Sequence, residues 1–117
     1  MARRRKEREP EPSDVAVLRF ADGLLAKAET RFKGRRPNII LSREAENGIR
    51  LAVERAGGQL ILRLEHVVPM LGLSPAYTDP GRSYLLASSL QRRLKPLGVT
   101  VGTRGGGKFL SFALRAK

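Results

Sequence analysis

Three consecutive glycines at positions 105–107 separate two segments, 99–103 and 109–114, in which apolar residues recur in an alternating pattern. Alternation places every second side chain on one face, as in a strand with one buried face. Because glycine adopts the left-handed conformations that turns require, the pattern predicts a β-hairpin with a long, flexible tip. Arg104 and Lys108 border the glycines, so the tip is also basic.

The same glycine-rich string does not have the pattern of a nucleotide-binding loop. Such a loop ends in Gly-Lys-Ser/Thr and opens a helix after a strand. Here Lys108 is followed by Phe109 and then by a strand pattern. We therefore expect the string to be only the tip of the hairpin.

The segment before the hairpin is predicted to be a long helix that begins at Asp79-Pro80 and ends before Gly98. A capping carboxylate followed by proline in the first turn is a typical helix start. At about 100° per residue, one face carries a stripe of leucines, whereas the opposite face is mostly polar or basic and includes one leucine, Leu85. The buried stripe is Leu86, Leu90, Leu94 and Leu97, and the outer face is Arg82, Leu85, Ser88, Ser89, Arg92 and Lys95.

A second helix is predicted after Ser42, which is a good N-cap, and Gly57-Gly58 should end it. A short strand at 59–62 and a short helix at 67–71 follow. Proline is tolerated in the first turn of a helix, so Pro69 must kink the short helix if it lies deeper.

The N-terminal region is predicted to hold an amphipathic helix of about 19 residues, capped by Ser13. Its apolar stripe must be covered, either by the chain's own body or by a second copy, so a homodimer through Leu18, Leu25 and Phe32 is possible. The full stripe is Leu18, Ala21, Leu25, Ala28 and Phe32. We expect a flexible basic tail at 1–12, this helix and a basic link at 13–36, and a main domain at 37–117.

The charge of the chain indicates which kind of partner it binds. The chain carries 23 Lys and Arg against 11 Asp and Glu, a net charge of +12 over 117 residues. No acidic residue follows Asp79, although eight basic residues do. Such a single-sign field is the footprint expected for a polyanion, most commonly nucleic acid. The basic block at 3–6 and a second basic cluster are expected to add phosphate contacts, and this cluster consists of Arg31, Lys33, Arg35 and Arg36.

Several function classes are disfavoured. The absence of cysteine and the single histidine, His66, exclude disulfides, thiolate metal sites and His-rich metal sites. Glu65 and His66 are adjacent, and neighbours on a helix do not face each other, so we expect no enzyme and no cofactor. No apolar run approaches a membrane span, so we expect no membrane partner and a cytoplasmic, nucleoid-associated protein. Many charged residues with few Asn and Gln are typical of thermophiles.

The order of predicted elements from Ser42 onward is helix, strand, short helix, long helix and hairpin. This order resembles the winged-helix family, and His-Val-Val-Pro-Met-Leu-Gly-Leu-Ser at 66–74 resembles the turn region of a helix-turn-helix. The resemblance implies that the helix at 80–97 is a recognition helix entering the DNA major groove, and that the hairpin is the wing. The segment 75–78 makes the turn longer than in the simple motif.

The sequence thus predicts an α+β winged helix-turn-helix protein with an extra N-terminal helix. Its expected partner is duplex DNA, in a transcriptional regulator or a chromatin-type protein. The few aromatic residues, 5% of the chain, argue against single-strand binding, although one of Phe109 and Phe112 should be exposed. RNA binding, or an adaptor role on a polymerase or ribosome that uses Leu85 and the first helix, is the alternative. The expected contacts are Arg3, Arg4, Arg5, Lys6, Arg35, Arg36, Arg82, Ser88, Ser89, Arg92, Arg93, Lys95, Arg104 and Lys108.

Overall fold

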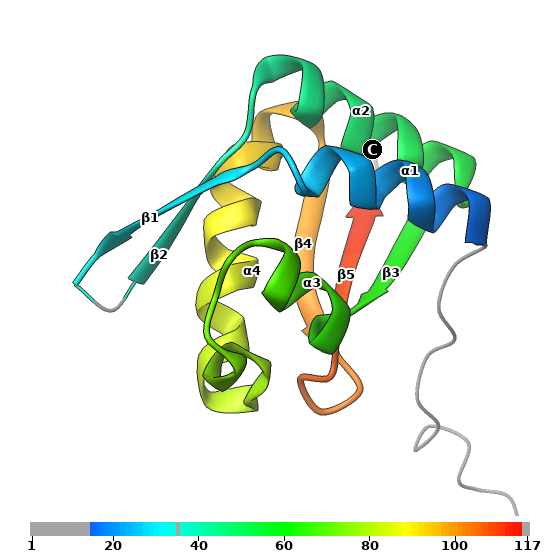
Figure 1. The fold of residues 1–117 in the computed structure, drawn as a ribbon. Helices are drawn as coiled ribbons and strands as arrows, with labels where there is room; N and C mark the ends of the chain where they lie inside the picture. Colours follow the sequence, from blue (N-terminus) through cyan, green and yellow to red (C-terminus); the bar gives the residue numbers. More distant parts are fainter. Residues whose placement is uncertain (1–14, 35, 116–117) are drawn as a thin grey trace, which may run out of the picture.

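The computed structural model describes residues 15–34 and 36–115, and it shows the expected α+β class. Four α-helices and two short 3-10 helices lie in this part of the chain (Figure 1). They are α1 (Val15–Leu25), α2 (Arg43–Arg55), α3 (Leu64–Met70), η2 (Pro75–Thr78), α4 (Pro80–Leu94) and η3 (Lys95–Leu97).

Five strands form two small antiparallel sheets within the same residues. One is a two-stranded hairpin, and the other has three strands in the order β3-β5-β4. The strands are β1 (Glu29–Lys33), β2 (Arg36–Ile40), β3 (Gln59–Arg63), β4 (Val99–Arg104) and β5 (Phe109–Leu114).

The helices enclose one aliphatic core against the three-stranded sheet. α4 packs along β4, α2 contacts β3 and β5, and α1 lies on α2 and α3 (Figure 1). The leucine stripe of α4 points inward as predicted, and Leu86, Leu90 and Leu94 are each 0% exposed. Phe112 joins them from the central strand β5.

Local sequence explains most of the helix ends. The Ser42 hydroxyl accepts a hydrogen bond from the Ala45 N–H at 3.0 Å, and the Asp79 carboxylate accepts one from the Gly81 N–H at 3.2 Å. Gly98 has φ of 79°, a left-handed conformation that ends the helical segment. Pro69 lies in the last turn of α3, which ends one residue later at Met70. The predicted ends at Ser42, Asp79-Pro80 and Gly98 are confirmed. The predicted start of the short helix at 67 is wrong, because α3 begins at Leu64 without a side-chain cap.

The predicted N-terminal helix is too long, because α1 stops at Leu25. The next residues form β1, which pairs with β2 through partners such as Thr30 and Ile39. Gly34, with φ of 65°, lies in the connection between the two strands. Ser13, the expected cap, lies outside the described residues.

Because α1 ends at Leu25, the residues of the predicted apolar stripe are divided between α1 and the segment that follows it, which includes β1. Leu25 is 1% exposed in the core, and Leu18 is half-buried against the same core, so α1 packs on its own chain. Phe32 lies on β1 and is 53% exposed. Leu25 is therefore not available to a second copy, and a homodimer through Leu18 and Phe32 stays a prediction. No helix among the described residues is long and apolar enough to cross a membrane.

Candidate nucleic-acid interface

The helix α4 is bordered by a strand on each side. On one side, the Ser89 hydroxyl accepts a hydrogen bond from the Ile39 N–H of β2 at 2.8 Å. On the other, Gln91 bridges to β4, donating to the Val99 carbonyl at 3.3 Å and accepting from the Val101 N–H at 2.6 Å. Because residues are about 100° apart on a helix, a strip between these two sides points away from the body. The exposed members of the strip are Tyr84, Ser88, Arg92 and Lys95.

Two residues expected on the outer face lie elsewhere. Ser89 is only 2% exposed, so the prediction that it contacts nucleic acid is wrong. Its hydroxyl is turned toward β2, where it satisfies a buried backbone N–H. Leu85 is half-buried and packs against the core, so it is not an exposed leucine on a solvent face.

Arg93 is half-buried beside the same strand. Its Nε donates a hydrogen bond to the Ile39 carbonyl at 3.1 Å. The Ile39 N–H and C=O groups are thus both bound by α4 side chains, from Ser89 and Arg93 respectively. Arg93 holds β2 in place and lies beside the outward strip, whereas Arg92 is exposed on that strip.

The remaining predicted contacts are exposed where the structure describes them. Arg82 lies in the first turn of α4, Arg36 begins β2, and Arg104 and Lys108 lie at the two ends of the β4–β5 connection. Residues Arg3, Arg4, Arg5, Lys6 and Arg35 lie outside the described residues.

A basic hollow of about 610 Å³ lies between the β1–β2 hairpin and α4. Four of its seven lining residues are cations, and none is a carboxylate. The lining consists of Lys33, Arg36, Pro37, Asn38, Ser89, Arg92 and Arg93. A smaller hollow of about 460 Å³ shares Arg92 and Arg93, and it adds Arg43 and Glu46.

None of the four cations of the basic hollow forms an ion pair with a carboxylate of the described residues. The ion pairs found among the described residues lie elsewhere, at Arg31–Glu29, Arg50–Glu54 and His66–Asp22. Unpaired surface cations that converge on one hollow create a positive potential that attracts a polyanion. The sequence analysis assigned Lys33 only to a basic link. No local pattern around Lys33 predicts that it lines the same hollow as Arg92.

The tip of the β4–β5 hairpin folds toward α4. Gly105, Gly106 and Gly107 all have positive φ, as the turn requires. A Cβ on Gly107 would lie 3.0 Å from the Pro80 Cα, so the tip passes close to the start of α4. The Lys108 carbonyl also accepts a hydrogen bond from the Leu64 N–H at 3.0 Å. The tip is thus hydrogen-bonded to the start of α3 and lies close to the start of α4.

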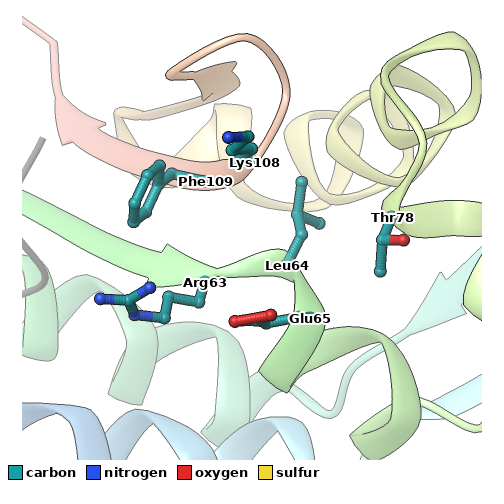
Figure 2. A pocket seen from close by; sticks show the side chains of 6 residues that line it. All are labelled: Arg63, Leu64, Glu65, Thr78, Lys108 and Phe109. Carbon is teal, nitrogen blue, oxygen red and sulfur yellow. The ribbon is translucent and has the colours of Figure 1, made fainter. Parts of the chain in front are cut away.

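A third hollow, of about 370 Å³, lies beneath this tip. Figure 2 shows its six lining side chains, which come from the β3–α3 junction, η2 and the start of β5. Its charges are mixed, because Glu65 lies with Arg63 and Lys108, so it has a weaker preference for a phosphate than the basic hollow.

Neither phenylalanine of β5 is exposed, contrary to the expectation. Phe109 is 2% exposed and Phe112 is 0% exposed. Phe112 lies in the core, and the Arg63 guanidinium covers Phe109 with its Cζ 5.6 Å from the ring centroid. No stacking platform for unpaired bases is formed by these two rings.

His66 contacts a residue that the sequence did not suggest. Its Nε2 lies 2.9 Å from the Asp22 carboxylate, which joins α3 to α1. Within the described residues, no group of three His, Asp or Glu side chains could hold a metal ion.

Comparison with known proteins gives no relative for this chain. No protein-family model matches it, and searches of curated proteins and of solved structures gave no match. The functional argument therefore rests on the residues and their geometry.

Proposed function

We propose that the protein is a winged-helix protein that binds duplex DNA, with α4 as the recognition helix. The observation that carries this proposal is the outward strip of α4, where Arg92 and Lys95 lie exposed next to the basic hollow. The element order α2, β3, α3, α4, β4, β5 supports it, because it resembles the helix-turn-helix followed by a β-hairpin wing.

Geometry favours duplex DNA over RNA. An α-helix with its side chains is about 10–12 Å across, and the major groove of B-form DNA is about 12 Å wide. The major groove of A-form RNA is too narrow for side chains to read. Of the six aromatic residues, only Phe32 and Tyr84 are exposed among the described residues, which disfavours stacking on unpaired bases.

Within this arrangement the residues have different tasks. Ser88 and Arg92 lie on the outward strip and are placed to reach base edges, whereas Lys95 and Arg82 are near the ends of α4 and are placed to reach phosphates. We propose that the basic block at 3–6 adds phosphate contacts of its own. We propose a regulatory or chromatin-type role on the nucleoid for this binding.

The adaptor alternative is less well supported. It depended on an exposed Leu85 and on an uncovered stripe along the first helix. Leu85 packs against the core, and Leu25 of α1 is buried. An adaptor would bind bare duplex DNA weakly at every salt concentration. A titration of duplex DNA at several salt concentrations therefore separates the two functions.

The test is a fluorescence anisotropy titration of a labelled 16-base-pair duplex, repeated from low to physiological salt. If about 5 phosphates are contacted, log affinity should fall with log salt at a slope of about −4 to −5. Arg92→Ala should weaken binding, by about 1–3 kcal/mol on a site where it pairs with a guanine. The control is Arg19→Ala, an exposed arginine of α1, which should change neither affinity nor slope.

Two outcomes would overturn the proposal. One is an affinity that does not change with salt. The other is equal binding of the DNA duplex and of an RNA duplex of the same sequence, because α4 could not enter the A-form groove.

A further inference from the structure

The β1–β2 hairpin projects from the body, yet its base is held on both strands (Figure 1). On β2, the two backbone polar groups of Ile39 are bound by Ser89 and Arg93 of α4. On β1, the Thr30 hydroxyl donates to the Leu71 carbonyl at 2.8 Å, and the Phe32 ring centroid lies 6.4 Å from that of Tyr77. The direction in which the hairpin projects is therefore set by α4 and by the α3–η2 region.

The edge of β2 that faces α4 is closed to another strand. Strand residues alternate in the direction of their N–H and C=O groups, so Pro37 and Ile39 face the same edge. Pro37 has no N–H, and both polar groups of Ile39 are already bonded. This side of the hairpin presents side chains to a partner, and those side chains are basic.

The charges of the hairpin fall into two kinds. Arg31 is paired with Glu29 on the same strand at 2.8 Å. Lys33 and Arg36, which face each other across the tip, have no carboxylate partner among the described residues and line the basic hollow with Arg92. The unpaired charge is thus concentrated at the end of the hairpin and beside the outward strip of α4.

We propose that the β1–β2 hairpin is a second phosphate clamp, which holds one sugar–phosphate backbone of the duplex in the basic hollow while α4 lies in the major groove. This inference rests on the proposed function. A helix about as wide as the groove brings the elements on its two sides against the two bordering backbones. Here those elements are β2, which is bonded to Ser89 of α4, and β4, which is bonded to Gln91 of α4.

The length and chemistry of the hairpin fit this task. Five residues of antiparallel strand extend about 17 Å, enough to pass beyond a helix about 10–12 Å across. Guanidinium groups bind phosphate oxygens through two parallel hydrogen bonds, so Arg36 can hold a phosphate with Lys33 beside it, while Arg92 reaches the base edges. Arg93 is a positioning residue, because its Nε is bonded to the Ile39 carbonyl. The tip of the β4–β5 hairpin, with Arg104, serves the other backbone.

The experiment compares Lys33→Ala/Arg36→Ala with Arg31→Ala in salt titrations on a short DNA duplex. Loss of two phosphate contacts should lower the magnitude of the salt slope by about 1.8. At about 0.1 M salt, each lost contact corresponds to about an 8-fold loss of affinity. Arg31→Ala should change both much less, because Arg31 is bonded to Glu29 and does not line the basic hollow.

A second measurement on the wild-type protein uses ¹⁵N-labelled chain and a 12-base-pair duplex. The amide signals of Lys33, Gly34 and Asn38 should shift together with those of Ser88 and Arg92. Shifts confined to α4 and the β4–β5 tip, or a double variant with an unchanged slope, would overturn the clamp while leaving DNA binding intact. Absence of any duplex binding by the wild type would overturn the proposed function and the clamp together.

Discussion

The Ser89 hydroxyl accepts a hydrogen bond from the Ile39 N–H at 2.8 Å, and both residues are buried. This bond joins the inner flank of α4 to the base of a hairpin that lies fifty positions earlier in the chain. It places the basic tip of the hairpin and the outward strip of α4 in one rigid arrangement. Fold stability and the geometry of the proposed interface therefore depend on the same contact.

Ser89→Ala should be clearly destabilising. The substitution leaves the buried Ile39 N–H without a partner, which costs about 1–3 kcal/mol. Ser88→Ala is the matched control, since Ser88 is exposed on the same helix and should change stability by less than about 0.5 kcal/mol. Urea unfolding followed by circular dichroism measures both. Equal midpoints for the two variants would contradict the role assigned to this bond.

The helices α2 and α4 were predictable because their ends are marked locally, whereas α3 has no side-chain cap and its start was predicted three residues too late. Ser42 and Asp79-Pro80 cap helix starts, and Gly98 ends one with a left-handed backbone, so short-range chemistry decides these boundaries. The leucine stripe of α4 then has only one way to face a core. This part of the fold could be predicted because the capping residues and the periodicity of the apolar residues indicate the same helices.

The β1–β2 hairpin was missed because the helical spacing of apolar residues continues past Leu25. Ala28 and Phe32 extend that spacing by chance, and the basic tip resembled a helix-ending link. The segment forms a hairpin and not a helix because its two strands pair, as Thr30 does with Ile39, and because α4 is bonded to β2. Tertiary contacts of this kind override a local pattern.

The site was predictable in composition and less so in geometry. Arg36, Arg82, Ser88, Arg92 and Lys95 are exposed as expected. Which of two adjacent serines or arginines points outward depends on where β2 packs, and nothing near Ser89 or Arg93 in the sequence carries that information. The same holds for Phe109, whose cover is the Arg63 side chain of another strand.

Gly107→Ala should destabilise the tip of the β4–β5 hairpin. Gly107 has φ of 87°, and an added Cβ would lie 3.0 Å from the Pro80 Cα, so strain and a steric clash combine. Left-handed strain alone costs about 1–2 kcal/mol. Gly106→Ala provides the comparison, because Gly106 has φ of 70° but nothing within 4 Å of its Cβ position. Thermal unfolding should rank wild type above Gly106→Ala, and Gly106→Ala above Gly107→Ala.

Leu25→Ala should destabilise the fold without dissociating an oligomer. Leu25 is 1% exposed in the core, and truncation of a buried leucine costs about 2–5 kcal/mol. Light scattering on the folded variant should give the same mass as for the wild type. A change from dimer to monomer with an unaltered unfolding midpoint would instead show that Leu25 lies in an interface.

Arg92 and Arg93 are adjacent in sequence but should respond differently to substitution. Arg92 is exposed on the outward strip, so Arg92→Ala should weaken duplex binding and leave the free energy of unfolding within about 0.5 kcal/mol of the wild type. Arg93 donates to the Ile39 carbonyl, so Arg93→Ala should cost about 1–2 kcal/mol of stability. It should also weaken binding, because the hairpin loses one of its two bonds to α4. Unfolding and anisotropy titrations on the same two samples make the comparison. If both variants lost affinity with unchanged stability, both arginines would contact DNA, and the positioning role of Arg93 would be wrong.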